Sequence, residues 1–542
     1  MSDPAGTQRH PAFFTVPSLL LIGPLCVVGA IIGVELITTL GITTNTALIG
    51  ALAGMSLARL PLAMFAHYRS PHMQNLAQTA ISASTFGAGN ALLLPIGIPF
   101  VMGRPDLVGP MLLGVFLAML VDGYLLYRLF DSEVFPAEAA WPPGVAAAEV
   151  IRADDASGRG GEHGGAWLLL GLGVGIIGAI YRVPMSAFGV AMIGNIWALA
   201  MFGAGLLLRG HSDFLFGWLT PGGDLMRAHV PHGVMVGAGL AALIQVAMLI
   251  RNGRPASGTR VGFGQLGPAL GSPLGPALGL GTGAYLAIAL LLALFGGLYS
   301  ALPPGMLLLF IVFAAFAAYF HTLIVGLAAM HTGWFPAFAV ALITLLVGML
   351  IGFPPAALCL LVGFSAATGP SFASLGYSFK AGHILRGDGA NPVFERDGRK
   401  HQLFAAMFAF GVAGAVVWLT HDGFFAADRV APAGRVYVAA INAGASSDVA
   451  WQLAIWAIPG ALIQFAGGPS RQLGVLLAAG LLVLNPAAGW AVVAGIALRG
   501  WLMKRTAGRK RGEMEVFAAG VIAGDALHSL FDAASRVLAA KR

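Results

Sequence analysis

The chain has 542 residues, of which 58% are hydrophobic and only 10% are charged, whereas about 25% of residues are charged in an average soluble domain. A mean hydropathy of +0.82 over the whole length excludes a soluble globular protein, because such a protein needs a charged surface. Two cysteines, Cys26 and Cys359, lie in apolar runs, which excludes a disulfide scaffold and a cysteine metal cage. The solvent of most of this chain is therefore predicted to be lipid.

Apolar runs long enough to cross a bilayer recur along the whole chain. A hydrocarbon core of about 30 Å needs about 20 apolar residues per helix, and about sixteen candidate runs are present, several of them too short or too polar to span simply. We therefore predict an all-α fold, a polytopic transmembrane helical bundle. In chain order the predicted segments are Val16–Leu40, Thr44–Met64, Met73–Ile98, Leu107–Phe130, Ala166–Ile180, Met185–Leu208, Val230–Ile250, Gly279–Leu302, Met306–Val325, Phe335–Ile351, Pro355–Ala373, Leu403–Thr420, Val449–Phe465, Leu473–Leu484, Ala487–Trp501 and Met514–Leu538.

Two places in this series differ from a simple span. The segment Met73–Ile98 contains amides and a proline, and two runs are split at Asn485–Pro486. Irregular backbone at membrane depth survives only where protein or a water-filled cavity satisfies its polar groups. We therefore expect re-entrant or broken helices here, and a transport pathway beside them.

Few connections between the predicted segments are long, and none is large enough for a soluble catalytic domain. Basic residues are distributed among such loops, as in an inner-membrane protein that follows the positive-inside rule. This rule places loops 251–276, 377–402 and 502–513 in the cytoplasm of a bacterial inner (plasma) membrane. The same distribution of the +7 net charge argues against nucleic-acid binding.

The order of apolar runs and glycine-rich turns in Ile31–Ala91 occurs again in Ala293–Leu346, about half a chain length away. Transporters built from internal repeats show such spacing. We therefore predict two repeated halves, residues 1–302 and 303–542.

Ionisable side chains inside apolar runs are the first candidates for function, because each costs about 2.5–3.5 kcal/mol at mid-bilayer. Glu35 is a lone carboxylate and is predicted either to couple protons or to face headgroups at a helix end. Asp525 and His528 are three residues apart and share one helical face. They can pass a proton or form an ion pair between two helices.

Two histidines, His321 and His331, flank a stretch of small residues. They are ten residues apart, too far for a metal-chelating i, i+4 pair, so we predict no metal site and no cofactor. Each is a candidate proton-coupling residue, the alternative being a buried histidine that donates to a neighbouring helix. Asp122 and Arg182 are near span ends and are expected to extend towards the membrane surface.

Three uncharged segments place amides, hydroxyls and indoles beside glycines within the membrane. Each alone is typical of small-residue packing between helices, but the three together predict a polar substrate cavity. The predicted substrate-binding residues are Gln74, Asn75, Gln78, Thr79, Ser82, Asn195, Trp197, Thr332 and Trp334.

Four motifs in order resemble the oligopeptide transporter (OPT) family, which includes the yellow stripe-like metal-chelate carriers. The segment HMQNLAQTAISAS is similar to the family's Asn-x-x-x-Gln-Thr segment. VFPAEAAWPPGVAAAEVIRAD resembles its acidic-Pro-Gly loop and places Glu149 at that family's glutamate. EVFAAGVIAGDALHSL resembles its closing helix, with Asp525 at a glutamate position. SFKAGHILRGDGANPVFERDGRKHQ is similar to a basic loop of the family, with matching positions at Lys380, Gly382, Lys400 and Gln402.

The resemblance implies a proton-driven symporter of small oligopeptides or metal-chelate complexes. The expected partners are a small-molecule substrate (peptide or metal chelate), protons and the lipid bilayer, and glycine-rich helices allow a homodimer as readily as a monomer. The chain contains no GxxxxGK[ST] motif, which favours a secondary active transporter over an ATP-driven pump. An acid such as Glu35 or Asp525 is then expected to take the proton while one half moves against the other.

The alternative from another class is a polytopic membrane enzyme of the acyl- or prenyl-transfer type. Such an enzyme needs clustered acids or histidines near one membrane surface. Its only candidates are Asp154, Asp155, Glu162 and His163, and the Gly and Ser residues around them are typical of a flexible solvated loop. We therefore predict a transporter and not an enzyme.

Overall fold

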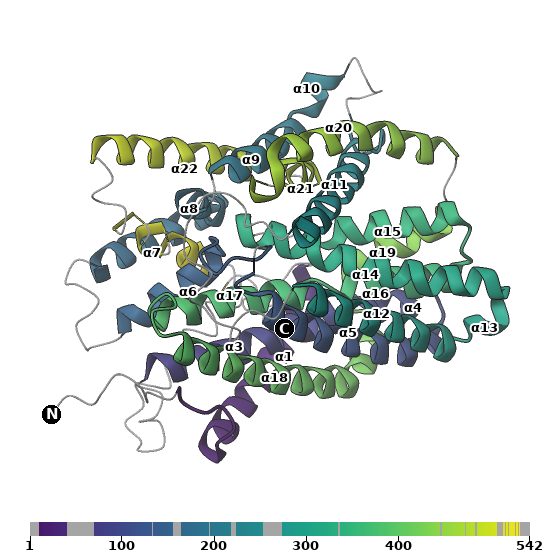
Figure 1. Cartoon of the computed structure of the whole chain (residues 1–542), viewed down its shortest axis with the longest axis horizontal. Coiled ribbons are helices and arrows are strands. Elements are labelled where there is room, and N and C mark those ends of the chain that lie inside the picture. The colour runs from purple at the N-terminus through teal and green to yellow at the C-terminus, as the bar shows by residue number, and fades with distance from the viewer. Residues whose placement is uncertain are drawn as a thin grey trace.

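A computed structural model describes most of the chain, and the following account is confined to the described residues. These residues are 10–40, 70–132, 134–154, 164–194, 196–217, 224–252, 274–333, 337–444, 447–471, 473–482, 485–506, 513–514, 516–518, 520–525, 527–528 and 531. The described part consists of helices and short connections (Figure 1) and contains no named strand. The predicted all-α class is confirmed.

Eight described helical spans are long and apolar enough to cross a membrane. Many of the long helices run along the longest axis of the molecule, which is horizontal in Figure 1. Six of the spans are α1 (Val16–Leu40), α5 (Val108–Leu129), α12 (Leu274–Phe295), α14 (Pro304–Thr332), α18 (Pro392–Ala426) and α22 (Pro486–Arg505), and the other two are the composite spans Pro71–Val101 and Pro355–Leu385.

Shorter helices complete the bundle. Several of them are apolar, and α11 packs along α20 while α9 packs along α21. Their bounds are α6 (Pro142–Asp154), α7 (Gly164–Ile180), α8 (Met185–Ile193), α9 (Ile196–Gly210), α10 (Ser212–Phe216), α11 (Val230–Asn252), α13 (Leu298–Ala301), α15 (Ala337–Ile351), α19 (Pro432–Ala443), α20 (Ser447–Arg471) and α21 (Leu473–Leu482).

The span Pro71–Val101 is not re-entrant, and the expectation for Met73–Ile98 is corrected in this respect. It runs without interruption through α3 (Pro71–Phe86), a π-helical segment η2 (Gly87–Leu93) and α4 (Leu94–Val101). A π-helical turn contains more residues than an α-helical turn. It is formed here by GAGNALL, which ends two residues before Pro95, a residue that has no N–H to donate. In the apolar stretch of the span Pro71–Val101, 94% of the residues are buried. This span therefore lies inside the bundle.

The second composite span, Pro355–Leu385, is as deeply buried and is broken near its middle. It comprises α16 (Pro355–Ala367) and α17 (Pro370–Leu385). Gly369 has a φ of +95° and Pro370 begins α17. Glycine supplies a backbone conformation that other residues rarely adopt, so the sequence Thr368–Gly369–Pro370 ends one helix and starts the next.

The two buried spans pack against each other through α3 and α17, and α1, α6 and α18 pack around them. Close approach depends on small residues, as expected where lipid supplies no hydrophobic drive between helices. A Cβ atom at Gly33 of α1 would lie 2.1 Å from the Thr85 carbonyl oxygen of the first buried span. The polar residues of α3 are therefore shielded from lipid.

Helix α18 has 35 residues and a length of about 52 Å, well beyond the bilayer core of about 30 Å. Its polar first part precedes the apolar run that begins at Leu403. The expectation that 377–402 forms a loop is wrong, because α17 continues to Leu385 and α18 begins at Pro392. The charged side chains in the polar first part of α18 form ion pairs, which allow them to be buried, as described below.

Some predictions fall outside the described residues. The segment Thr44–Met64 lies there, as does most of loop 251–276. Of loop 502–513, α22 includes the residues up to Arg505, and 507–512 are outside the described part. The division into halves at 302 stays a prediction.

Candidate substrate site

Polar side chains of α3 form the centre of the candidate site. Gln74, Gln78 and Ser82 repeat every four residues, so they lie along one face of the helix. This face is buried, and its polar atoms must therefore find partners on other helices. Gln78 Nε2 donates to Ser378 Oγ at 3.1 Å, and Ser82 Oγ lies 3.1 Å from Ser374 Oγ.

Helix α18 supplies a third wall through Gln402. Its Nε2 donates to Thr79 Oγ1 at 3.2 Å and to the Ser378 carbonyl oxygen at 2.7 Å. Its Oε1 accepts from Arg386 Nη1 at 2.8 Å. The single side chain thus joins three segments. We call the following set the polar core site: Gln74, Asn75, Gln78, Thr79, Ser82, Ser374, Ser378 and Gln402.

Two acceptors of the polar core site have no hydrogen-bond partner within the described part of the chain. These are Gln74 Oε1 and Asn75 Oδ1, both buried. A Cβ atom at Gly382 would lie 2.8 Å from Asn75 Oδ1, 2.3 Å from Gln402 Oε1 and 2.4 Å from Arg386 Nη1. The missing side chain at Gly382 therefore leaves room for three polar groups to converge beside α17. A buried polar atom without a partner is costly, and a polar ligand can supply the missing donors.

A buried charged cluster adjoins the polar core site. Glu395 accepts from Arg386 at 2.7 and 3.0 Å and from Arg399 Nη2 at 3.1 Å. His383 Nδ1 lies 3.7 Å from the same carboxylate. A second carboxylate, that of Asp131, lies 3.8 Å from Arg399 Nη2, so two carboxylates balance the two guanidinium groups. Because Arg386 also binds Gln402, one of these guanidinium groups reaches the polar core site directly.

Helix α17 is held in place by the connection after α5 and by α6. Lys380 Nζ donates to the Ala137 carbonyl oxygen at 2.8 Å, and Trp141 packs edge-on to Tyr377. Arg152 donates to the Ile384 carbonyl oxygen at 2.7 Å and pairs with Glu149 at 3.0 Å. Glu149, which the resemblance singles out, therefore acts on α17 through Arg152.

No described contact places the remaining predicted substrate residues at the polar core site. Trp197 is 60% exposed on α9, with the Arg471 guanidinium 5.2 Å from its ring centroid. Thr332 is the last residue of α14, and Asn195 and Trp334 lie outside the described residues. For these four residues a substrate role stays a prediction.

The predicted proton-coupling carboxylates have definite partners. Arg429 donates to both carboxylate oxygens of Glu35, with Nη1 3.1 Å from Oε1. Asp525 accepts from the Ser186 backbone N at 3.0 Å and from the Ser186 hydroxyl. His528 lies three residues beyond Asp525 and is partly exposed.

Both predicted histidines are buried in α14. His321 Nδ1 lies 2.5 Å from the Thr368 carbonyl oxygen, and its Nε2 lies 2.7 Å from the Ala337 carbonyl oxygen. His331 Nε2 has no partner among the described atoms. The two histidines share a helix, but no described contact joins their side chains, so the structure does not bring them together.

Asp122 corrects an expectation, because it does not extend towards the membrane surface. Its side chain is fully buried and accepts from the Tyr285 hydroxyl, from Thr322 Oγ1 at 3.2 Å and from the Gly369 backbone N at 2.6 Å. Arg182, by contrast, is exposed in the turn after α7, as expected.

Several site residues were not predicted as such. Ser371, Ser374 and Ser378 have helical spacing, which could have revealed a second polar face. Arg386, Glu395 and Arg399 were interpreted as loop charges. Their pairing joins residues across a turn and gives no signal in composition.

The candidates for the enzyme alternative gain no support from the described residues. Asp154 is the last residue of α6, and Asp155, Glu162 and His163 lie outside the described part. Within the described residues, no group of three His, Cys, Asp or Glu side chains is placed to hold a metal ion.

Buried helical spans with a polar site between them, in a bundle of apolar helices, define an integral multi-pass membrane protein of the transporter class. The sequence profile of the OPT oligopeptide transporter protein family matches residues 15–251 and 280–535. The chain therefore belongs to this family, and the resemblance inferred from the four motifs is confirmed. It is a membrane oligopeptide transporter by family, and this family is one of transporters and not of enzymes. Comparison with individually curated proteins finds no match to the chain.

Proposed function

We propose that the protein is a proton-coupled symporter of small oligopeptides or of metal chelates of amino-acid-derived compounds, and that the polar core site binds the substrate. The observation that carries this proposal is the pair of buried acceptors without partners, Gln74 Oε1 and Asn75 Oδ1. Asn75 Oδ1 adjoins the Gln402 amide and the Arg386 guanidinium at Gly382, and Gln74 Oε1 belongs to the residue directly before Asn75 on α3.

The chemistry of these groups suits a peptide. A peptide offers N–H donors to the free amide oxygens, and its carbonyl groups accept from the amide nitrogens of Asn75, Gln78 and Gln402. Its terminal carboxylate can accept from the guanidinium group of Arg386, which already donates to Gln402 of the polar core site. A carboxylate-bearing chelator offers the same groups, so one site accounts for both substrate classes.

The site lies at the junction of the two predicted halves. Helix α3 belongs to residues 1–302, whereas α17 and α18 belong to residues 303–542. In the present conformation Gln78 and Ser82 bind the serines of α17 directly, so the site is closed. Movement of one half against the other separates these pairs and lets substrate replace them.

For proton coupling we propose Asp525 with His528, and we retain Glu35, His321 and His331 as further candidates. Asp525 is supported by its position, because its partner Ser186 belongs to α8, far away in sequence. The ion pair of Glu35 with Arg429 favours a structural role for that carboxylate. Protonation of Asp525 removes a charge-assisted acceptor from Ser186 and so weakens the contact with α8.

We place the charged cluster on the cytoplasmic side of a bacterial inner (plasma) membrane. Arg386, Arg396, Arg399 and Lys400 lie together around the start of α18, and cytoplasmic ends of membrane helices carry an excess of such residues.

The decisive experiment is uptake by purified protein in liposomes under an imposed inward pH gradient. Labelled di- and tripeptides and iron or nickel chelates are offered side by side. Accumulation that depends on the gradient supports symport and identifies the substrate class. If folded protein accumulates none of these compounds, the proposal is wrong, and the enzyme alternative or an unrelated solute becomes the better explanation.

Two matched glutamine variants connect uptake with the site. Gln78→Met removes the amide that binds Ser378 and is expected to lower uptake by about tenfold or more. Gln245→Met serves as the control, because Gln245 is also a buried glutamine and pairs with Gln464 between α11 and α20. Equal effects of the two variants would show that Gln78 supports folding alone.

A further inference from the structure

One peptide group at the break between α16 and α17 is held from both sides. The Thr368 carbonyl oxygen lies 2.5 Å from His321 Nδ1, and the N–H of the same peptide group, that of Gly369, donates to Asp122 Oδ2 at 2.6 Å. The imidazole and the carboxylate are thus joined through a single peptide unit. Both side chains are fully buried.

Both ring nitrogens of His321 face carbonyl oxygens. Its other ring nitrogen, Nε2, lies 2.7 Å from the Ala337 carbonyl oxygen. Carbonyl oxygens only accept hydrogen bonds, so a neutral imidazole donates to one of them and a protonated imidazole donates to both.

The partners of Asp122 define its charge. The Tyr285 hydroxyl, the Thr322 hydroxyl and the Gly369 N–H all converge on its two oxygens. A carboxylate with only donors around it is stabilised in its ionised form. Protonation of the carboxylate would turn one of these acceptor oxygens into a donor.

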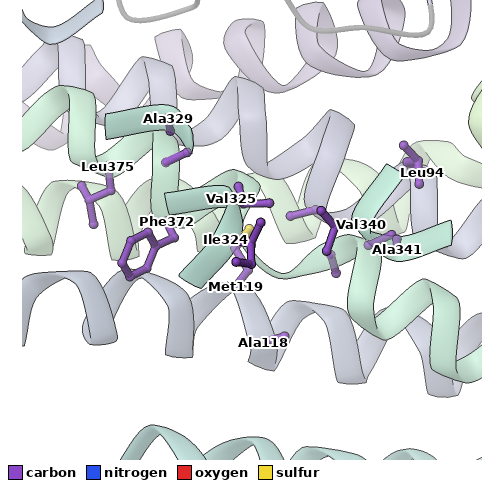
Figure 2. Close-up of a cluster of buried hydrophobic side chains, with 14 of the residues drawn as sticks. Leu94, Ala118, Met119, Ile324, Val325, Ala329, Val340, Ala341, Phe372 and Leu375 are labelled. Carbon is purple, nitrogen blue, oxygen red and sulfur yellow. The ribbon is translucent and has the colours of Figure 1, made fainter. Parts of the chain in front are cut away.

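The surroundings of the pair are apolar. Met119 of α5, Ile324 and Val325 of α14 and Phe372 of α17 are buried around the break (Figure 2). Tyr319 of α14 packs edge-on to Tyr285 at 5.8 Å between ring centroids.

Other elements packed here present no further charge. Phe364 of α16 packs against Tyr285, and Phe410 and Met407 of α18 face α5 at Gly123. Among the described groups that face the pair, only Tyr285 and Tyr319 are titratable, and both are phenols. A proton that reaches Asp122 therefore has no other described carboxylate nearby to bind to.

We infer that Asp122 is a proton-binding site that controls the break between α16 and α17, an inference that rests on the proposed proton coupling. A hydronium ion gives up a proton to Asp122 Oδ2 and becomes water, and the protonated oxygen no longer serves as a charged acceptor for the Gly369 N–H. This loss favours a conformation in which the peptide group moves away.

Release of this peptide group frees the start of α17, which carries Ser374 and Ser378. These serines bind Ser82 and Gln78 of α3, so displacement of α17 opens the polar core site. Protonation and substrate access are thereby coupled through one helix.

A cross-linking experiment measures this movement without transport. Ser82→Cys and Ser374→Cys are introduced together after Cys26→Ala and Cys359→Ala, and the hydroxyls they replace are 3.1 Å apart. Asp122→Asn offers one acceptor oxygen where three donors converge, so it is expected to slow disulfide formation by about fivefold or more at constant pH. The control pair is Thr344→Cys with Ser365→Cys, whose hydroxyls are 3.2 Å apart before the break. Equal cross-linking of the first pair with and without Asp122→Asn would overturn the inference.

A transport experiment in liposomes tests the coupling itself. Asp122→Asn is expected to retain exchange of labelled for unlabelled substrate and to lose accumulation driven by the pH gradient by about tenfold or more. Wild-type accumulation together with equal accumulation by the variant overturns the inference and leaves symport standing. Failure of the wild type to accumulate contradicts symport, and the cross-linking rates then still decide whether Asp122 holds the break.

A milder variant covers the case in which Asp122→Asn fails to fold. Tyr285→Phe removes one donor to the carboxylate and leaves the ring in place. The proton is then bound more readily, and the midpoint of the pH profile of uptake is expected to rise by about one pH unit. An unchanged profile in folded Tyr285→Phe protein would contradict proton binding at Asp122.

Discussion

Gln78 of α3 donates to Ser378 of α17, a residue 300 positions further along the chain, at 3.1 Å. This contact joins the two most deeply buried spans, and each span contributes a helical row of polar side chains to it. A membrane protein gains little from burying such rows unless they meet a polar ligand at some stage. The following predictions test the surroundings of this contact.

Gly382→Ala is expected to reduce uptake by about tenfold or more and to leave the protein folded. The added Cβ atom would lie 2.3 Å from Gln402 Oε1 and 2.4 Å from Arg386 Nη1, so it displaces both groups from the polar core site. Gly423→Ala in α18 is the matched control, because its Cβ atom would meet nothing within 4 Å. Uptake in liposomes measures the effect, and similar activity of both variants would refute the role of Gly382.

Glu395→Gln is expected to destabilise the protein by about 3 kcal/mol or more, because it leaves Arg386 buried without a counter-ion and leaves Arg399 with Asp131 alone, at 3.8 Å. Thermal unfolding in detergent provides the measurement. Asp106→Asn removes the carboxylate of the exposed pair with Arg104 and should change stability by less than about 1 kcal/mol. A loss as small as that of the control would mean that the charged cluster contributes little to stability.

Asp525→Asn is expected to abolish proton-driven accumulation while sparing folding. The amide keeps an acceptor for Ser186 but cannot gain or lose a proton. Accumulation under a pH gradient is the measurement, and Asp213→Asn, in the short helix α10, serves as the control. Unchanged uptake by a correctly inserted Asp525→Asn protein would exclude this carboxylate from the coupling.

The docking of the N-terminal segment is expected to weaken with acid. Burial, and secondly the Arg386 guanidinium, lower the pKa of His10 from 6.5 to about 3. A histidine with a lowered pKa in the docked state contributes full stability above pH 6.5, and this stability falls as the pH decreases from 6.5 towards 3. The loss is about 1.4 kcal/mol for each pH unit within that range.

Hydrogen exchange of the amides at Thr15 and Leu19, corrected for intrinsic rates, measures this docking at pH 7 and pH 5. His10→Asn should remove the pH dependence. His211→Asn alters an exposed histidine before α10 and should leave it unchanged. Protection that does not vary with pH in the wild type would contradict the assignment.

The sequence places the amides and hydroxyl of Gln74, Gln78 and Ser82 within one apolar segment, and the structure shows that they share one buried face of α3. Their role in substrate binding stays a prediction. The sequence did not predict the polar and charged side chains of α17 and α18 that face α3. Arg386 and Glu395 have the composition of a solvated loop, and only their mutual pairing allows them to be buried.

The burial of Asp122 was also not predicted from the sequence, because its partners are even farther away along the chain. Its partners Tyr285, Thr322 and Gly369 are 163, 200 and 247 residues away, and no local pattern connects them. Hydropathy therefore identified the membrane helices, whereas the pairing of buried charges required the structure.

The π-helical segment η2 allows the backbone hydrogen bonds of the span Pro71–Val101 to survive the deletion of one residue, but it does not protect the packing of the span. Deletion of a single residue between Gly87 and Leu93 converts wide turns into regular α-helical turns, and hydrogen bonding along the span is kept. The deletion also rotates α4 by about 100° relative to α3, which turns the apolar face of α4 away from its neighbours α5, α16 and α19. In an evolutionary sense, the orientation of α4 relative to the polar face of α3 depends on a single extra residue in the middle of a helix.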